Sequence, residues 1–299
     1  KSAVDTSTLT NGGKMTAEQQ KQFTTVMEEY SGFRKRVNFV NMQSVSRDLA
    51  SLEVNKRSMR RQVENADKPA TGTAANKRRQ LRAQGVIMPY DVTFQYRKEN
   101  IEGKNIDSTL AKLFAQQFSN DSVDLAWNGD EASSDPFESI NDGYLKIAET
   151  DTDTHKYDTA AATDIMEIFD GALAMMPSKY YQLYAQEDKN LIKIFCSHEM
   201  NREYKKLIQS RNTNLGDAML LNGQHVTYDG YEIYPLGFIP NGTIVVTPFE
   251  NLAYGVYGQS LEVYSDVVPR KTRYEYTLLA DTDMEIINPD ALVIGKKRT

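Results

Sequence analysis

The sequence is poor in the residues that form disulfides and membrane spans. Its single cysteine, Cys196, cannot form an internal disulfide, which excludes a disulfide-stabilised scaffold and favours a reducing compartment such as the bacterial cytosol. No run approaches the roughly 20 consecutive apolar residues that a membrane-spanning helix needs. We therefore expect a globular protein of 299 residues, long enough for more than one domain and without contact to a membrane.

The sequence also lacks the local motifs of common enzymes. It contains no glycine-rich phosphate loop and no nucleophile-elbow serine. Cys196 and His198 stand two residues apart, and a Cys–His pair can form an activated nucleophile. Because Cys196 ends an apolar stretch, a buried structural thiol is the favoured interpretation.

The densest acidic run consists of Glu149, Asp151 and Asp153 and ends at His155. Its 1-3-5 spacing is that of a calcium loop, but the glycine turn and the distal glutamate are missing. The three histidines show no metal-ligand spacing with one another or with Cys196. The run is therefore expected to be a solvated linker between domains, and the chain is predicted to have no catalytic residues, no cofactor and no metal.

Charge is distributed unevenly along the chain. Residues 44–85 contain ten basic and four acidic residues, which gives this segment a net charge of +6. Because the whole chain has a net charge of −6, the rest of it carries −12. A basic segment on an acidic body can bind nucleic acid or the acidic body of another copy of the same chain. The candidate contact residues are Lys56, Arg57, Arg60, Arg61, Lys77, Arg78, Arg79 and Arg82.

The basic segment reads as a long projecting hairpin. Residues 50–57 and 78–86 can pair as strands, and residues 64–76 are loop-like. The segment has little to bury, so its order should depend on what it touches. It contains no aromatic residue, whereas an arm for single-stranded nucleic acid would interleave aromatics. A contact with another copy is therefore favoured over nucleic-acid binding, and a merely solvated loop is the remaining interpretation.

The other segments predict an α+β protein. Residues 1–14 read as a mobile arm, and the helix that follows from Thr16 has one apolar face, which must cover its own body or a neighbour. A helix of about 30 Å is expected over residues 108–127. After residue 151, helices capped by Thr163 and Ser197 alternate with short strands. The apolar face of the arm is formed by Phe23, Val26, Met27 and Tyr30.

Three groups of strings, in this order, resemble the major capsid proteins of tailed bacteriophages, in the branch typified by phage P-two. The first runs from Leu125-Ala126-Trp127-Asn128-Gly129 through Ser133-Ser134-Asp135-Pro136 to Gly143-Tyr144-Leu145. The second is Pro240-Asn241-Gly242-Thr243-Ile244-Val245-Val246-Thr247 with Glu250-Asn251-Leu252, and the third is Pro269-Arg270 with Tyr274-Glu275-Tyr276. The resemblance spans most of the chain from about residue 31 onward, and its specificity comes from the ordered set.

The resemblance implies the Johnson (HK ninety-seven type) capsid fold. Residues 1–33 would be the N-terminal arm and 44–85 the extended loop. Residues 34–43, 86–150 and 262–299 would form the peripheral domain with its spine helix at 108–127. Residues 151–261 would form the axial domain.

The resemblance also implies a function. Copies of the chain would assemble as pentamers and hexamers into an icosahedral shell around double-stranded DNA, bound without sequence specificity. Expected partners are a scaffold, a portal and a maturation protease, whose cleavage would explain a chain that starts at Lys1. The protein would assemble in the bacterial cytoplasm and end in the virion. The alternatives are a nucleic-acid-binding protein that uses the basic hairpin and a cellular nanocompartment shell of the same fold.

Overall fold

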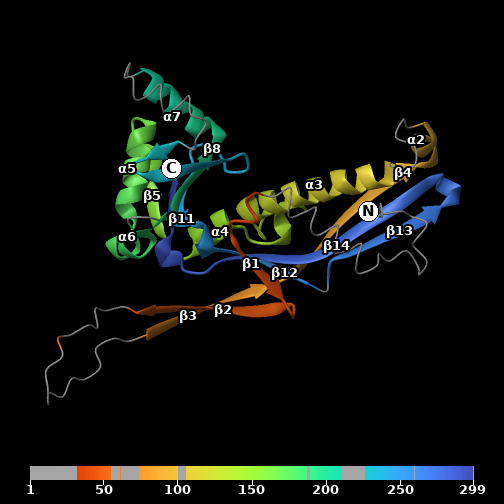
Figure 1. Cartoon of the computed structure of the whole chain (residues 1–299), viewed down its shortest axis with the longest axis horizontal. Helices are drawn as coiled ribbons and strands as arrows, with labels where there is room; N and C mark the ends of the chain where they lie inside the picture. Colours follow the sequence, from red (N-terminus) through yellow and green to blue (C-terminus); the bar gives the residue numbers. More distant parts are fainter. Residues whose placement is uncertain are drawn as a thin grey trace, which may run out of the picture.

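The computed structural model describes residues 32–54, 61, 74–99, 106–186, 189–210, 226–258 and 260–298. The chain forms an elongated molecule in which a helix-rich α+β region stands at one end of a long flat sheet (Figure 1). A two-stranded hairpin projects from the junction of the two regions (Figure 1). The four apolar residues predicted for the arm, Phe23, Val26, Met27 and Tyr30, lie outside the described residues.

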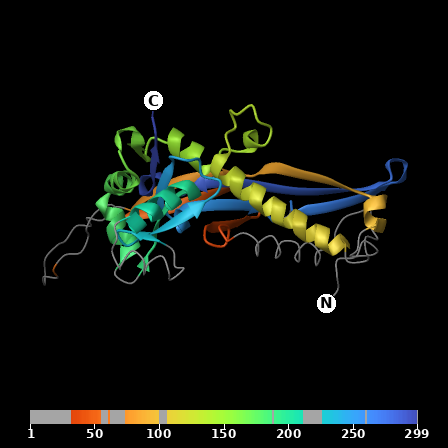
Figure 2. The same ribbon diagram turned by 90° about the horizontal axis from the view of Figure 1, so that it is seen from above.

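The flat region is a five-stranded sheet covered by one long helix. Its strands are β1 (Asn38–Met42), β4 (Gln84–Thr93), β12 (Leu252–Tyr257), β13 (Glu262–Val268) and β14 (Arg273–Ile286). The fourteen residues of β14 pair with β4, β12 and β13, so this strand joins the sheet together. Helix α3 (Ile106–Asn128) includes all residues of the helix predicted over 108–127. It runs along the long strands (Figure 2). Its Ala115 and Phe118 pack against the buried Leu278 of β14.

The second region is a six-stranded sheet, ordered β5-β15-β11-β8-β10-β9. Its strands are β5 (His155–Asp158), β8 (Ile192–Ser197), β9 (Thr227–Tyr228), β10 (Tyr231–Leu236), β11 (Ile244–Pro248) and β15 (Val293–Lys296). Three helices belong to this region: α5 (Ile165–Met175), α6 (Ser178–Tyr184) and α7 (His198–Ser210). Smaller elements are α2 (Phe94–Glu99), α4 (Tyr144–Thr150), β6 (Ala185–Gln186) and β7 (Lys189–Asn190).

The six-stranded sheet is buried on both faces because its side chains alternate between two cores. Ile194 of β8 packs with Phe169 of α5 in one apolar cluster. The adjacent Phe195 points the other way and packs with Trp127, which ends the long helix. Trp127 is fully buried and also contacts the rings of Phe33 and Tyr144. The aromatic cluster therefore joins the two regions.

Strand pairing crosses residue 261, because β12 pairs with β14 of the flat sheet and β15 pairs with β5 and β11. One expectation about an element boundary needs correction. The helix that begins at Ile165 is capped by Asp164 instead of Thr163. The Asp164 carboxylate accepts hydrogen bonds from the backbone amides of Met166 and Glu167, and Thr163 instead donates to Glu167. The expected Ser197 cap is confirmed, since its hydroxyl accepts from the Met200 amide.

The end of α3 makes a close backbone contact that requires two glycines. The amide of Gly143, just before α4, donates to the Gly129 carbonyl over 2.8 Å. A Cβ atom at Gly129 would lie 2.2 Å from the Asn141 carbonyl oxygen, and one at Gly143 would lie 2.7 Å from the Gly129 nitrogen. The Trp127-Asn128-Gly129 and Gly143-Tyr144-Leu145 strings thus meet in space.

Replacing Gly129 by Ala is expected to destabilise the protein, because backbone atoms on both sides would have to move. Overpacking of this kind costs about 1–3 kcal/mol, which urea unfolding would measure. Gly32 has open space around its Cβ position, so Gly32→Ala is the matched control and should change the free energy of unfolding little. Equal stability of the Gly129 and Gly32 variants would contradict the close-approach argument.

Candidate subunit-interaction hairpin

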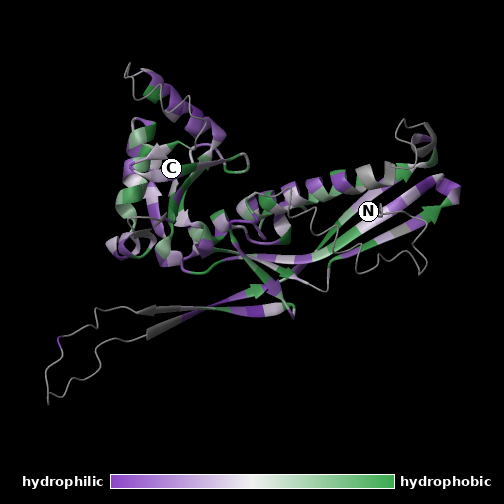
Figure 3. Ribbon diagram, viewed as in Figure 1, coloured by the Kyte–Doolittle hydropathy of each residue, from purple (hydrophilic) through white to green (hydrophobic). Residues whose placement is uncertain are grey.

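The basic segment forms a hairpin of β2 (Ser46–Val54) and β3 (Ala74–Arg82), with Ala50 opposite Arg78. Two paired strands were expected, but they lie about four residues earlier than residues 50–57 and 78–86. The reason is the root of the hairpin, where Leu81 is fully buried beside Met42 and Ala83. Hydrophilic colours dominate the part of the two strands that lies next to this root (Figure 3).

Strand alternation divides the basic residues of β3 between two faces. Successive side chains of a strand point to opposite faces of the ribbon. Lys77 and Arg79 share the face of buried Leu81 and point toward the body. Arg78 and Arg82 lie on the other face and are exposed. Of the remaining predicted contact residues, Arg61 is exposed, whereas Lys56, Arg57 and Arg60 lie outside the described residues.

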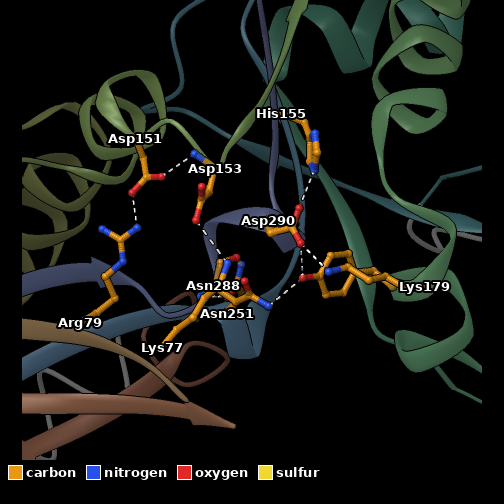
Figure 4. Close-up of polar contacts among 10 residues, drawn as sticks. Lys77, Arg79, Asp151, Asp153, His155, Lys179, Asn251, Asn288 and Asp290 are labelled. Carbon is orange, nitrogen blue, oxygen red and sulfur yellow. Dashed lines mark hydrogen bonds and ion pairs between the residues drawn. The ribbon is translucent and has the colours of Figure 1, made fainter. Parts of the chain in front are cut away.

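The two body-facing cations bind the acidic run that follows α4 (Figure 4). The Arg79 guanidinium pairs with the Asp151 carboxylate, whose side chain is only 10% exposed. Lys77 Nζ lies 3.2 Å from Asp153 Oδ2. This finding corrects the expectation of a solvated linker, because Asp151 is largely buried beneath the hairpin. The signal in the sequence was the matched two-residue spacing of the cations and the carboxylates.

Two further carboxylates lie beneath the root of the hairpin. Asp283 Oδ2 on β14 accepts a hydrogen bond from the Arg82 amide over 2.5 Å. Burial raises the pKa of Asp283 to about 6, despite this hydrogen bond. Burial likewise raises the pKa of Glu285 to about 7, which the neighbouring Arg79 partly opposes. These carboxylates make the root of the hairpin sensitive to protonation.

The last residue of the acidic run belongs to a separate polar network in the six-stranded region (Figure 4). His155 Nε2 lies 3.0 Å from Asp290 Oδ1, and Lys179 Nζ lies 2.5 Å from Asp290 Oδ2. Tyr180 also donates to Asp290 and accepts from Asn288. Burial opposes ionisation of Asp290, but the bonds from Lys179, Tyr180 and His155 outweigh it and lower the pKa. The network holds α6 against the chain before β15.

The reactive groups considered in the sequence have structural surroundings. Cys196 is fully buried, and burial raises the pKa of its thiol to about 12, which keeps it in the unreactive protonated form. Within the described ranges, no group of three or more His, Cys, Asp and Glu side chains could hold a metal ion. No helix in those ranges is long and apolar enough to cross a membrane.

Comparison with known proteins identifies a relative in sequence and several relatives in fold. No family model matches the chain. It is 25% identical over 230 residues to a Bacillus subtilis (strain 168) protein named "Putative prophage capsid protein YqbE", covering 75% of this chain and 70% of that protein. The chain in the satellite phage P4 procapsid superimposes with a TM-score of 0.72 at 12% identity, over 97% of this chain and 94% of that one. The prophage capsid relative and the capsid fold together support a phage major capsid protein.

The capsid protein has the α+β Johnson fold, which is not restricted to phages. The SrpI encapsulin of Synechococcus elongatus PCC 7942 superimposes with a TM-score of 0.56 at 10% identity, over 91% of each chain. This likeness concerns the fold alone, so the sequence similarity to the prophage capsid protein favours the phage assignment. The capsid relative and the fold point to a structural role and to a location in the capsid of the virion.

Proposed function

We propose that this capsid protein forms the shell of a tailed phage as pentamers and hexamers that enclose double-stranded DNA. The observation that carries the proposal is the prophage capsid relative combined with a capsid fold over nearly the whole chain. A head-to-tail contact between identical subunits closes into a ring when its rotation allows, and rings can tile a closed shell. The packaged DNA would be held without sequence specificity.

The outward face of the hairpin would contact a neighbouring subunit. Arg78 and Arg82 are exposed there, and the acidic body of a second copy offers complementary charge. Lys56, Arg57, Arg60 and Arg61, which stand between the two strands in the sequence, would add to this contact. Many weak contacts of this kind stabilise a shell because each subunit engages several neighbours at once.

The remaining parts of the proposal concern the arm and the assembly partners. The apolar arm face of Phe23, Val26, Met27 and Tyr30 would pack on its own body or on a neighbour. A scaffold, a portal and a maturation protease would act with the protein during assembly in the bacterial cytoplasm. The support for each of these partners is the likeness to phage capsid proteins.

Electron microscopy of the purified protein, with light scattering on the same sample, tests the proposal. Closed particles or rings of five and six subunits are the expected result. If only monomers or dimers form even when the scaffold is co-expressed, the shell proposal is wrong. Nuclease-protected DNA inside particles from infected cells would separate a virion from a nanocompartment, whose content would be protein. Tight binding of free subunits to DNA, lost steeply with salt, would favour the nucleic-acid-binding alternative.

A further inference from the structure

The hairpin joins the body through a narrow root. One connection is residues 43–45, which are bends, and the other is Ala83, the single residue between β3 and β4. The Ala83 amide donates to the Val45 carbonyl over 2.8 Å and closes the two connections against each other. Buried Leu81 and the hydrogen bond of the Arg82 amide to Asp283 anchor the root, so a change in the direction of the hairpin would turn about this point.

The ion pairs to the acidic run lie away from this root. Arg79 and Lys77 are four and six residues beyond Ala83, which corresponds to roughly 13–20 Å along an extended strand. Contacts at this distance resist rotation more effectively than contacts at the root itself. They also join the hairpin to a different region, since Asp151 and Asp153 lead into β5 of the six-stranded sheet.

The two pairs match in register. Lys77 and Arg79 are two residues apart on one face of β3, and Asp151 and Asp153 are also two residues apart. The Asp153 amide donates to Asp151 Oδ1 over 2.8 Å, which fixes the turn that presents both carboxylates. The equal spacing lets both cations of β3 reach a carboxylate of the acidic run at the same time.

We propose that these two ion pairs are an intrachain latch that fixes the direction in which the hairpin leaves the body. The Arg79–Asp151 pair is the stronger member, because its side chains are 30% and 10% exposed and are less screened by solvent. The Lys77–Asp153 pair, at 38% and 53% exposed, contributes less. In this arrangement Lys77 and Arg79 bind carboxylates of their own subunit, whereas the exposed Arg78 and Arg82 can contact another subunit.

The latch has a consequence for assembly that rests on the proposed function. A hairpin held in one direction loses little conformational freedom when it docks on a neighbour, so pre-organisation favours the contact. Without the latch, the same contact would have to order the hairpin as well. A latch-deficient subunit would therefore need a several-fold higher concentration to assemble.

Pulsed electron paramagnetic resonance on dilute, unassembled full-length subunits tests the latch. Spin labels would be attached at Ala50→Cys on β2 and Gln182→Cys on α6, both exposed positions. Cys196 is fully buried and should not react in the folded protein. We expect one narrow label-to-label distance distribution in the otherwise unchanged chain. It should at least double in width when Asp151→Asn and Asp153→Asn are combined.

Two further variants separate the latch from a general loss of structure. The swapped pair Arg79→Asp with Asp151→Arg should restore the narrow distribution that each single change broadens. The control Glu199→Gln removes an exposed ion pair with Arg202 on α7 and should change nothing. An unchanged narrow distribution in the Asp151→Asn, Asp153→Asn variant, with a native circular dichroism spectrum, would overturn the latch. Failure of swapped charges to restore the distribution would overturn the direct pairing.

The latch and the proposed function can fail separately. The label distance is measured on unassembled subunits and does not depend on whether shells form. Shell formation by the unchanged chain together with an insensitive distance would reject the latch and leave the shell function standing. If the label distance responds to the Asp151→Asn, Asp153→Asn change but the unchanged chain never assembles, the latch stands and the shell function is rejected.

Discussion

Reversal of the two outward cations of the hairpin, Arg78→Glu with Arg82→Glu, is expected to abolish shell assembly and leave a folded subunit. Both side chains are exposed in the single subunit, so reversal should cost it little stability. In a shell, the same positions would face the acidic body of a neighbour, where like charges cost several kcal/mol. Each 1.4 kcal/mol lowers an association constant tenfold, so we expect a loss of roughly 100-fold or more.

Light scattering and electron microscopy at matched subunit concentrations would measure this loss. The charge-conserving variant Arg78→Lys with Arg82→Lys is the matched control and should still assemble, because the proposed contact depends mainly on charge. Urea unfolding would show that the reversed subunit remains folded. Normal particles from the reversed variant would show that the outward face of the hairpin makes no essential contact. This result would not bear on the latch, because Lys77 and Arg79 are unchanged in the variant.

Local patterns were sufficient to predict the long helix α3 and the start of α7. Leu110, Phe114 and Phe118 recur at helical spacing, and Asn128-Gly129 supplies a stop, so α3 was expected close to its observed bounds. The Ser197 cap followed from the same reasoning. The residues that determine a helix and its ends lie within a short stretch of sequence. Tertiary packing did not override these local preferences in α3 and α7.

Strand partners could not be predicted in the same way. Strand β14 is one continuous element, but residues 273–282 pair with β4, residues 273–279 also pair with β13, and residues 282–286 pair with β12. No local pattern states which distant strand pairs with which. Both hairpin strands lie about four residues earlier than expected because Leu81 entered a core formed with Met42, a contact between residues far apart in the chain. A strand register follows such burial more than intrinsic propensity.

The candidate site was only partly predictable for the same reason. Composition identified the basic segment, but not which of its faces meets the body. Arg79 and Asp151 are 72 residues apart in sequence, so their pairing left no local signal beyond the matched spacing of charges. Asp283 and Glu285 were not singled out, because alternation on a strand does not reveal that another element covers the polar face.

The pH dependence of stability should reveal the buried carboxylate beneath the hairpin. The pKa of Glu285 is raised from 4.5 to about 7, mainly by burial, with Asp283 and Asp151 adding repulsion and Arg79 opposing it. A carboxyl with a raised pKa favours the folded state when protonated. Its contribution is therefore fully present below pH 4.5 and is lost as the pH rises to about 7. Ionised Glu285 should then destabilise the subunit at pH 8 by up to about 3 kcal/mol.

Glu285→Gln removes this penalty and keeps an oxygen that can accept the hydrogen bond from the Ile286 amide. The variant should be up to about 3 kcal/mol more stable than the unchanged subunit at pH 8, with the difference vanishing near pH 4.5. Urea unfolding across this range would measure both limits. Glu275→Gln is the control, because Arg273 lowers the pKa of Glu275 and its neutralisation should give no gain at pH 8. If Glu285→Gln gives no gain at pH 8 either, the carboxylate is solvated, and the root of the hairpin does not bury it.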